Sequence, residues 1–451
     1  MEKNSKKFSI KDAKVAFLTL GCKVNSYETE AMQALITAAG ALVVEFHENA
    51  DIYVVNTCSV TNMADKKSRQ MLHRAKKKNP KAIVVAAGCY AQTAEETAMR
   101  ENGVDVVIGN NQKKQIVSIL EQFLEGVENK RLEIAKETEY EDMSLDTRVE
   151  HTRAYIKIQD GCNQFCSYCI IPYARGRIRS RNPEDVVEEV KRLAAHGYQE
   201  VVLTGIHLSS YGRTSYERMT EEGGQPLLAL IWQLNAVEGI QRIRLGSLEP
   251  RIITENFVKT LCACEKVCPH FHLSLQSGSD TVLKRMNRKY TTAEYSASVD
   301  ILKKYYEAPA ITTDIIVGFP QETEEEFLET MEFAKHIGFS KIHVFKYSRR
   351  KGTVADKMSG QIAEQIKNER SERLIALETA LGEAYRERFL DKEEKVLFEE
   401  SIVVDGELCQ VGYNERYVRI AAKTEKNMSN QIKSVKILGK STEQETLLAE
   451  V

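Results

Sequence analysis

Three cysteines lie close together in the segment DGCNQFCSYCIIPYARGRIRSR, which covers residues 160–181. They are Cys162, Cys166 and Cys169, with the spacing C-x3-C-x2-C. Three thiols on one short loop can all face a single metal centre, but a structural zinc site needs four ligands. An iron–sulfur cube that is held by three thiolates leaves one iron open to bind another molecule. The loop therefore predicts an iron–sulfur centre with an open position.

Four arginines alternate with other residues directly after this loop. They are Arg175, Arg177, Arg179 and Arg181. In an extended chain, alternate side chains lie on the same face, so these guanidinium groups are expected to form one row. Such a row suits a carboxylate ligand, which arginine binds at two points. Contact with RNA phosphates and charge protection of an exposed strand edge are alternative explanations.

Three further cysteines each follow a short apolar run in the first part of the chain. Cys22 follows VAFLTLG, Cys58 follows DIYVVNT, and Cys89 follows AIVVAAG. The crevice outside the carboxyl ends of the strands is where open α/β sheets bind ligands. The three cysteines are therefore expected to meet there as a second three-thiolate site. The alternative is that they are buried as small apolar residues, as free cysteines often are.

The elements that must position these cysteines can be predicted as three sections. In the first, strand-like runs alternate with helix-length segments, which is typical of an open parallel sheet with helices on both faces. In the second, six strand-like runs alternate with helices and predict a partial β/α barrel. The strand-like runs are residues 15–20, 51–57, 82–88 and 104–109 in the first section and 154–159, 200–206, 242–247, 270–275, 311–319 and 341–348 in the second.

A charged helical stretch is expected from about residue 355 to 380, followed by four short strand-like runs that a small all-β barrel would close. Those runs are residues 395–401, 408–414, 416–422 and 434–440. The predicted fold class is thus α/β, with a C-terminal all-β barrel. The predicted domains are 12–125, 148–378 and 381–446, and the polar residues 126–150 are interpreted as a linker.

The composition of the chain indicates the cellular compartment in which the protein works. The formal net charge is −2, and no apolar run approaches the length of a membrane span. We therefore expect a cytoplasmic protein without a membrane partner, in which grouped thiols bind metal rather than form disulfides. The remaining cysteines, Cys262, Cys264, Cys268 and Cys409, are interpreted as packing residues.

Several motifs together resemble one enzyme family. The Cys162 loop, with Tyr168 immediately before its third cysteine, is similar to the cluster-binding loop of the radical S-adenosylmethionine superfamily. LGCKVN (20–25), NTCSVT (56–61), AGCYAQ (87–92) and VGFPQET (317–323) narrow the resemblance to the methylthiotransferases, over nearly the whole chain. The C-terminal section is similar to a TRAM domain, a small RNA-binding barrel. LGCKVN and CSVTNMADKKSRQ look most like the MtaB-type branch, which acts on threonylcarbamoyladenosine in tRNA.

The resemblance implies two [4Fe–4S] clusters and S-adenosyl-L-methionine as cofactors. An auxiliary cluster would be held by Cys22, Cys58 and Cys89, and the radical cluster by Cys162, Cys166 and Cys169. One S-adenosylmethionine would methylate a sulfur at the auxiliary cluster. A second would be cleaved to a radical that removes hydrogen from C2 of the adenine next to the anticodon. No catalytic acid–base pair is expected, because this C–H bond is not acidic.

The resemblance also implies partners and alternatives. The partners would be the tRNA anticodon loop, an electron donor protein such as flavodoxin or ferredoxin, and a sulfur donor. The same chemistry could act on isopentenyl-adenosine in tRNA or on an aspartate of a ribosomal protein. A non-catalytic iron–sulfur protein that binds RNA or senses redox state is the alternative from another class, and a zinc-binding RNA protein is a further one.

Contacts to the cofactor and substrate are predicted from position. Tyr168, Gly205, Glu249 and Gln276 are expected to contact S-adenosylmethionine, the last three because they follow strands. The four alternating arginines are candidates for the carboxylate of a threonylcarbamoyl group. Residues 66–81, with eight Lys/Arg and no acid, and residues 411–440 are candidate RNA surfaces.

Overall fold

The computed structural model describes residues 9–127, 129–144, 152–213, 225–424, 426–442 and 444–451. The chain forms two compact units. The first unit comprises residues 1–149, 157–182 and 348–356, and the second comprises residues 150–156, 183–347 and 357–451. The predicted domain boundaries remain predictions, and residue 148 lies outside the described residues.

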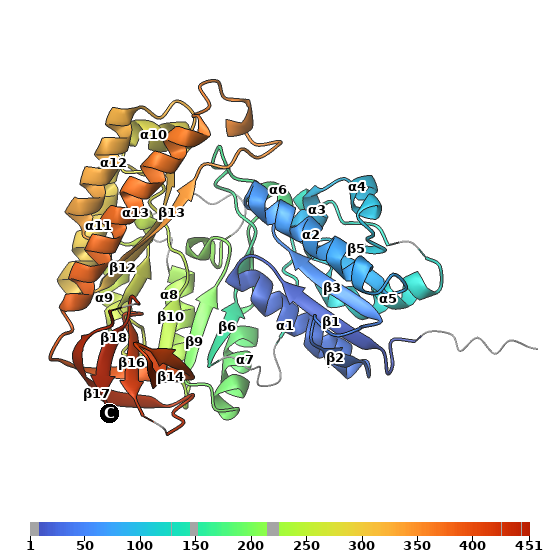
Figure 1. The fold of residues 1–451 in the computed structure, drawn as a ribbon, viewed down its shortest axis with the longest axis horizontal. Coiled ribbons are helices and arrows are strands. Elements are labelled where there is room, and N and C mark those ends of the chain that lie inside the picture. Colours follow the sequence, from blue (N-terminus) through green and yellow to red (C-terminus); the bar gives the residue numbers. More distant parts are fainter. Residues whose placement is uncertain (1–8, 128, 145–151, 214–224, 425, 443) are drawn as a thin grey trace, which may run out of the picture. The chain divides into compact units, whose positions relative to one another are not determined.

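A five-stranded parallel sheet forms the centre of the first unit, in the order β2-β1-β3-β4-β5 (Figure 1). Every neighbouring pair is parallel, which confirms the predicted open sheet. The edge strand β2 was not predicted, because its three residues are too few to show a period. The strands are β1 (Lys14–Thr19), β2 (Leu42–Val44), β3 (Ile52–Thr57), β4 (Ile83–Gly88) and β5 (Val106–Ile108).

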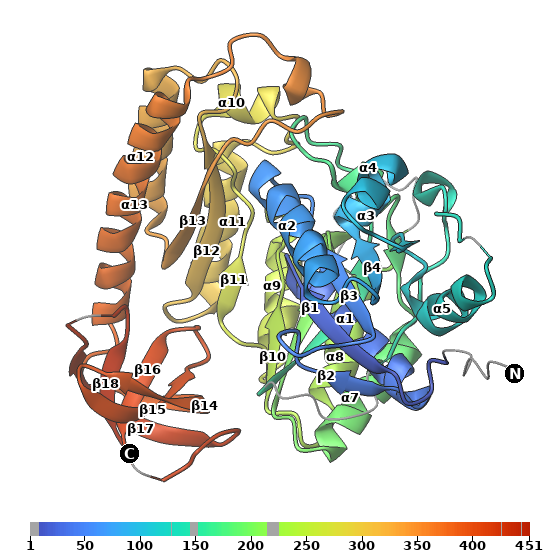
Figure 2. The ribbon, with the colours of Figure 1, turned by 45° about the vertical axis from the view of Figure 1, so that its right-hand side comes forward.

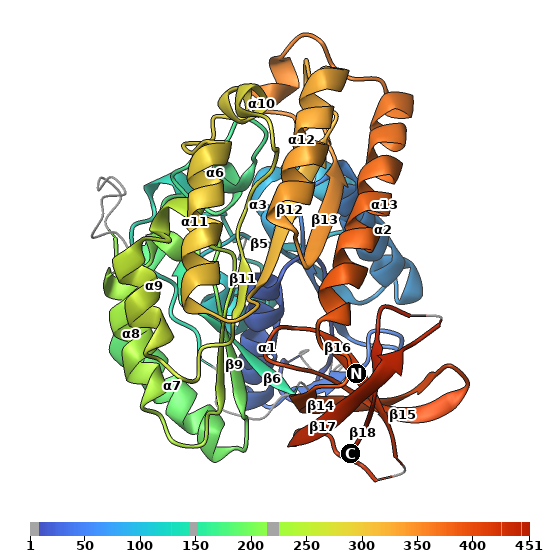
Figure 3. The ribbon, with the colours of Figure 1, turned by 90° about the vertical axis from the view of Figure 1, so that its left-hand side faces the viewer.

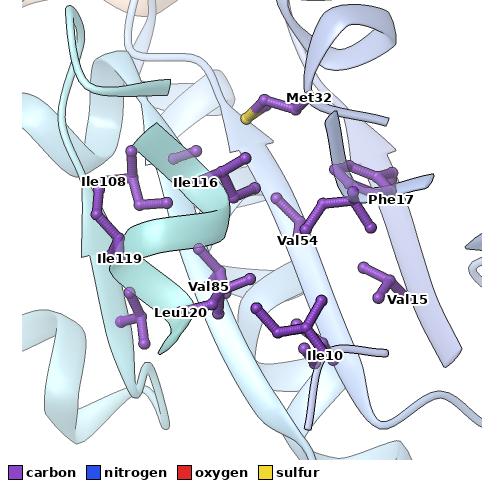
Figure 4. Close-up of a cluster of buried hydrophobic side chains, with 14 of the residues drawn as sticks. Ile10, Val15, Phe17, Met32, Val54, Val85, Ile108, Ile116, Ile119 and Leu120 are labelled. Carbon is purple, nitrogen blue, oxygen red and sulfur yellow. The ribbon is translucent and has the colours of Figure 1, made fainter. Parts of the chain in front are cut away.

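Helices cover both faces of this sheet because successive residues of a strand point to opposite sides. On one side Val54 packs with Met32 and Ile116, which come from α1 and α5 (Figure 4). On the other side Val55 packs with Leu72 and Tyr90, from α2 and α3. The helices are α1 (Lys23–Ala38), α2 (Asn62–Lys78), α3 (Cys89–Thr93), α4 (Glu96–Glu101) and α5 (Ile116–Leu124).

The segment with the Cys162 loop also belongs to the first unit. It holds the short helix α6 (Ile171–Ala174) and two short strands, β7 (Gln159–Asp160) and β8 (Arg179–Ser180), which pair antiparallel. The loop is therefore closed at its base by a two-stranded ladder.

Two three-stranded sheets, β10-β9-β6 and β11-β12-β13, form the partial barrel of the second unit. An isolated parallel bridge between Leu248 and Leu273 links them. Each predicted strand-like run of this section contains a strand, so the partial barrel is confirmed. The strands are β6 (Arg153–Lys157), β9 (Glu200–Thr204), β10 (Arg242–Leu245), β11 (His270–His272), β12 (Ala310–Val317) and β13 (Lys341–Lys346).

Helices of the second unit pack along one side of these strands, as α11 and α12 do beside β12 in Figure 3. Thr291 and Thr323 begin α11 and α12 with complete capping boxes, which satisfy backbone N–H groups that the helix leaves unpaired. The helices are α7 (Pro183–Ala195), α8 (Gln225–Asn235), α9 (Glu255–Cys262), α10 (Asp280–Arg285), α11 (Thr292–Tyr305) and α12 (Glu324–Ile337).

The long helix α13 (Glu364–Glu387) leads into a closed five-stranded barrel, β14-β15-β16-β18-β17 (Figure 2). The barrel confirms the predicted all-β section, although β18 was not predicted and pairs parallel to β16. Among the described helices, none is long and apolar enough to cross a membrane. The barrel strands are β14 (Glu393–Val404), β15 (Glu407–Tyr413), β16 (Arg419–Lys423), β17 (Ile432–Lys440) and β18 (Leu447–Glu450).

Candidate active site

The first three cysteines lie at the carboxyl ends of three adjacent strands, as predicted. Cys22 caps α1 after β1, Cys58 directly follows β3, and Cys89 is the first residue of α3 after β4. Gly21 has φ +106°, and a Cβ at this position would lie 2.9 Å from the Sγ atom of Cys58. A glycine is therefore needed beside the Cys58 thiol for both backbone and space.

The same three thiols interact electrostatically. Burial, together with the neighbouring thiols of Cys89 and Cys22, raises the pKa of the Cys58 thiol to about 11. The guanidinium group of Arg175 acts in the opposite direction and lowers this pKa. Only thiolates bind a metal centre, so Arg175 favours the charge state that a cluster requires.

The second three cysteines are all half-buried on one loop. The Cys169 amide donates to the Cys166 carbonyl over 3.0 Å, and the Gln164 amide lies 3.5 Å from the Sγ atom of Cys162. The Cys162 amide donates to the carbonyl of Gly176 over 3.0 Å, which folds the loop back on the residues that follow it. Partly exposed thiols with an N–H group near a sulfur suit a cluster that must also receive a ligand.

The chain after the second cysteine set packs against the first set within the same unit. The side-chain amide of Asn110 donates to the carbonyl of Ala174 over 2.7 Å and to the Sγ atom of Cys89 over 3.7 Å. The thiol of Cys89 also interacts electrostatically with Arg175 and raises the pKa of its guanidinium group, which burial opposes. The end of α6 thus lies next to the first cysteine set.

A buried group of charges surrounds this junction. Glu28 accepts from Lys113 and Lys157 over 2.7 Å each, and from Arg175 over 2.9 Å. Asp160 lies 2.7 Å from the Nζ atom of Lys157 and 3.1 Å from Arg175. Burial opposes the ionised form of Glu28, but the three cations hold the pKa of this carboxyl well below its ordinary value.

This group contains more positive than negative charge. Arg179 adds a fourth buried cation, 3.8 Å from Asp160, so four cations face three carboxylates, those of Glu28, Asp160 and Glu141, the last of which interacts with Lys113 and Lys157. Buried charge is costly unless it is compensated. A cluster held by three thiolates is anionic, so the donor set and its surroundings fit an iron–sulfur cluster at Cys22, Cys58 and Cys89.

The expectation that the four arginines line one face is wrong. Arg175, Arg179 and Arg181 are buried, and Arg177 is exposed. The α6 turn interrupts the extended conformation that a row requires, since only Arg179 and Ser180 form a strand. Arg181 donates to Asp142 over 2.7 Å, and Arg175 is held by Glu28 and Asp160. Protein carboxylates therefore pair with the buried guanidinium groups, Arg177 is the exposed one of the four, and the contact of these arginines with substrate stays a prediction.

Residues 348–356, from much later in the sequence, contact the loop after Cys58. Arg350 donates to Ser59 over 2.8 Å, to Asn62 over 2.9 Å and to Asp65 over 2.8 Å. The Ala355 amide also donates to the carbonyl of Ser167, inside the Cys162 loop, over 2.8 Å. Residues 348–356 therefore support both cysteine segments of the first unit.

The residues predicted to contact S-adenosylmethionine in the second unit lie near the carboxyl ends of strands. Gly205 directly follows β9, and Gln276 lies beyond β11 with φ +70°. Glu249 is buried between His207, at 3.3 Å, and Arg251, at 2.9 Å. Burial opposes its ionisation, but His207 and Arg251 hold its pKa at about 2. Tyr168 is half-buried on the Cys162 loop. Their contacts to the cofactor remain predictions.

Sequence reasoning missed the buried charges at the junction. Glu28, Lys113 and Lys157 carry no short motif, because they meet only through the fold. Asp160 and Asn110 were also missed. The position of Asp160 two residues before Cys162 was the single available signal.

Comparison with known proteins shows to which class of protein the chain belongs. Residues 156–334 match the family model for the Radical SAM superfamily. Residues 14–109 match the model for "Uncharacterized protein family UPF0004". The tryptophan-binding methyltransferase TsrM of Kitasatospora setae, a radical S-adenosylmethionine enzyme, superposes with a TM-score of 0.56 at 15% identity, over 74% of this chain and 73% of TsrM, and so shares the fold. The chain is thus a radical S-adenosylmethionine protein.

Relatives of similar length define the family. The chain is 44% identical over 434 residues to the threonylcarbamoyladenosine tRNA methylthiotransferase MtaB of Bacillus subtilis, which covers 94% of each chain. It is 43% identical to the Aquifex aeolicus protein of the same name, over 85% of this chain and 92% of that protein. A tRNA-2-methylthio-N(6)-dimethylallyladenosine synthase of Caldicellulosiruptor saccharolyticus is 33% identical, over 96% of this chain and 90% of that protein. The chain belongs to the radical S-adenosylmethionine tRNA methylthiotransferase family, which confirms the resemblance seen in the sequence.

Proposed function

We propose that this protein transfers a methylthio group to C2 of N6-threonylcarbamoyladenosine next to the anticodon of tRNA. The observation that carries the proposal is the junction in the first unit, where Asn110 and Arg175 connect the Cys89 site to the segment that follows Cys169. Two thiolate sites held in one compact unit can serve a single reaction. The MtaB relatives, at 44% and 43% identity, support the choice of nucleoside.

Two [4Fe–4S] clusters and S-adenosylmethionine are the proposed cofactors. Cys22, Cys58 and Cys89 would hold the auxiliary cluster, and Cys162, Cys166 and Cys169 the cluster with the open iron. When bound, the cofactors supply the one-electron chemistry that replaces hydrogen on a carbon too weakly acidic for a side-chain base. The protein's own part is to supply the thiolate ligands, to compensate their charge with Arg175, and to hold the two cysteine segments together.

The basic face of α2 is the proposed contact to the tRNA backbone. Lys66, Lys67, Arg74 and Lys77 are exposed on it, and the acidic residue of the helix, Asp65, is held by Arg350. In the C-terminal barrel, β17 exposes Lys433 and Lys436, whereas Lys423 and Lys440 pair with glutamates. Phosphate contacts of this kind supply affinity, and an unpaired anticodon base can be splayed out at low cost.

An electron donor protein such as flavodoxin or ferredoxin and a separate sulfur donor complete the proposal. A reductant is needed for each cleavage of S-adenosylmethionine, and sulfur must be supplied for every turnover.

Mass spectrometry of nucleosides from tRNA tests the function. A strain that lacks this gene would be complemented with the intact gene, with Cys22→Ala, with Cys162→Ala, or with Cys262→Ala as a matched control. Cys262 is half-buried in the second unit and donates to the carbonyl of Tyr305. We expect methylthiolated threonylcarbamoyladenosine with the intact gene and with Cys262→Ala, and its absence with either of the other variants.

Other outcomes would redirect the proposal. Loss of the methylthio group from isopentenyl-adenosine alone would assign the substrate of the 33% identical Caldicellulosiruptor relative. Unchanged tRNA nucleosides would contradict the proposal and favour a ribosomal-protein aspartate or a non-catalytic iron–sulfur role.

A further inference from the structure

Two histidines and an aspartate form a cluster on the second unit that the proposed chemistry does not use. His272, Asp314 and His343 come from the neighbouring strands β11, β12 and β13. Each offers one ligand atom, and these three atoms lie within 4.8 Å of one another. The set of two imidazoles and one carboxylate is a common donor set for zinc and other divalent transition metals.

Strand register explains why the three side chains meet. Asp314 pairs directly with His343, so both project from the same face of the sheet. Thr312 pairs with His272 and lies two residues before Asp314, which places His272 on that face as well. The ligand atoms are thus held by three hydrogen-bonded strands rather than by a mobile loop, a placement that favours precise metal geometry.

The separation of the first two ligand atoms matches a metal site. Nε2 of His272 lies 3.4 Å from Oδ2 of Asp314. Ligands about 2.1 Å from a tetrahedral metal ion are roughly 3.4 Å apart, by simple geometry from the usual zinc distances. The ligand atom of His343, an exposed residue, lies within 4.8 Å of the other two. Three protein ligands would leave one position of the ion open.

Thr312 supplies a supporting contact behind the cluster. Its Oγ1 atom lies 3.0 Å from Nδ1 of His272 and 3.4 Å from Nε2 of His270. When Nδ1–H donates to this hydroxyl, the Nε2 lone pair of His272 points toward Asp314. A second ring nitrogen fixed in this way is typical of metal-binding histidines.

We propose that His272, Asp314 and His343 bind one divalent transition-metal ion of the zinc class, with an open position for water or an oxygen ligand. The three residues belong to the second unit, whereas both cysteine sets belong to the first. Its occupation does not depend on the proposed tRNA reaction, so either proposal can fail alone.

Zinc binding by the intact protein tests the site. The protein would be purified anaerobically with its clusters, equilibrated with a zinc–chelator buffer, and analysed for zinc and iron per chain. The variants would be Asp314→Asn and His343→Ala, with His336→Ala as the control. His336 is an exposed histidine on α12 that contacts Ser296.

We expect the intact protein and His336→Ala to retain one zinc per chain, and His343→Ala and Asp314→Asn to bind it at least 100-fold more weakly at unchanged iron content. The retention of iron would show that these variants fold and that zinc has not replaced iron at the cysteines. Equal zinc retention by His343→Ala and the intact protein would overturn the proposal, as would an intact protein that retains none. In either case the cluster is an ordinary histidine–aspartate contact.

Discussion

Arg175 and Glu28 form a two-point ion pair: Nη1 donates to Oε1 over 2.9 Å and Nη2 donates to Oε2 over 3.1 Å. The two residues are 147 positions apart in the sequence, and both are fully buried. Glu28 belongs to the helix that Cys22 caps, and Arg175 follows the helix that comes after Cys169. The pair therefore fixes the position of the Cys162 segment against the helix that begins at the first cysteine set.

Replacement of Glu28 with glutamine should destabilise the protein strongly. The change removes the carboxylate that Lys113, Lys157 and Arg175 share, and the loss of one partner from a buried ion pair costs about 3–5 kcal/mol. Urea unfolding should show a lower midpoint, and iron per chain should fall. Arg177→Ala is the matched control, because this arginine is exposed and rests on the ring of Phe165. An equal effect of both variants would contradict the role of the buried charge group.

Cysteine variants should separate the two cluster sites. Cys22→Ala removes a ligand from the auxiliary site alone, so we expect 5′-deoxyadenosine still to form from S-adenosylmethionine and a reductant. Cys162→Ala should abolish this product, because it removes a ligand of the cluster with the open iron. Each variant should lose about half of the iron. Loss of 5′-deoxyadenosine in Cys22→Ala while this variant keeps about half of the iron would show that the two sites do not act separately.

The helices and strands of this protein could be predicted from sequence patterns more completely than the contacts between its charged side chains. The strand-like runs before Cys22, Cys58 and Cys89 are long and apolar, so their burial and the positions of these cysteines could be predicted. The alternation of Arg175 to Arg181 suggested that the four side chains lie on one face. The sequence shows the spacing of these charges, but it does not show the helical turn of α6, which interrupts the extended chain. Glu28 and Lys113 could not be paired in advance, since their contact depends on how α1 packs.

Glu322 should make stability depend on pH between about 4.5 and 7. Burial raises the pKa of this carboxyl to about 7, despite the nearby guanidinium of Arg370 and the amides of Gly318 and Phe319. The folded protein then keeps a proton that the unfolded chain releases near pH 4.3. The contribution to stability is therefore complete below that pH and is lost as pH rises to 7, by roughly 3 kcal/mol in total.

Urea unfolding of Glu322→Gln across this pH range measures the effect. The glutamine variant should lack the decline, so its free energy of unfolding should rise relative to that of the unaltered protein from pH 5 to pH 7. Glu329→Gln, an exposed position on α12, should retain the decline. A constant difference between Glu322→Gln and the unaltered protein at all pH values would show that the carboxyl does not titrate in this range.

Neutral substitutions on α2 should weaken tRNA binding in a salt-dependent way. Lys66 and Lys77 are exposed on the helix, whereas Lys76 already binds Asp105 over 2.7 Å and is not expected to contact RNA. Each phosphate contact adds about 0.7–0.9 to the slope of log affinity against log salt concentration. In filter-binding measurements over a range of salt, Lys66→Ala with Lys77→Ala should reduce that slope by about 1.5, and lower affinity most at low salt. Lys259→Ala, on the exposed side of α9, should leave both unchanged. An unchanged slope in the α2 double variant would exclude this face of the helix from the RNA contact.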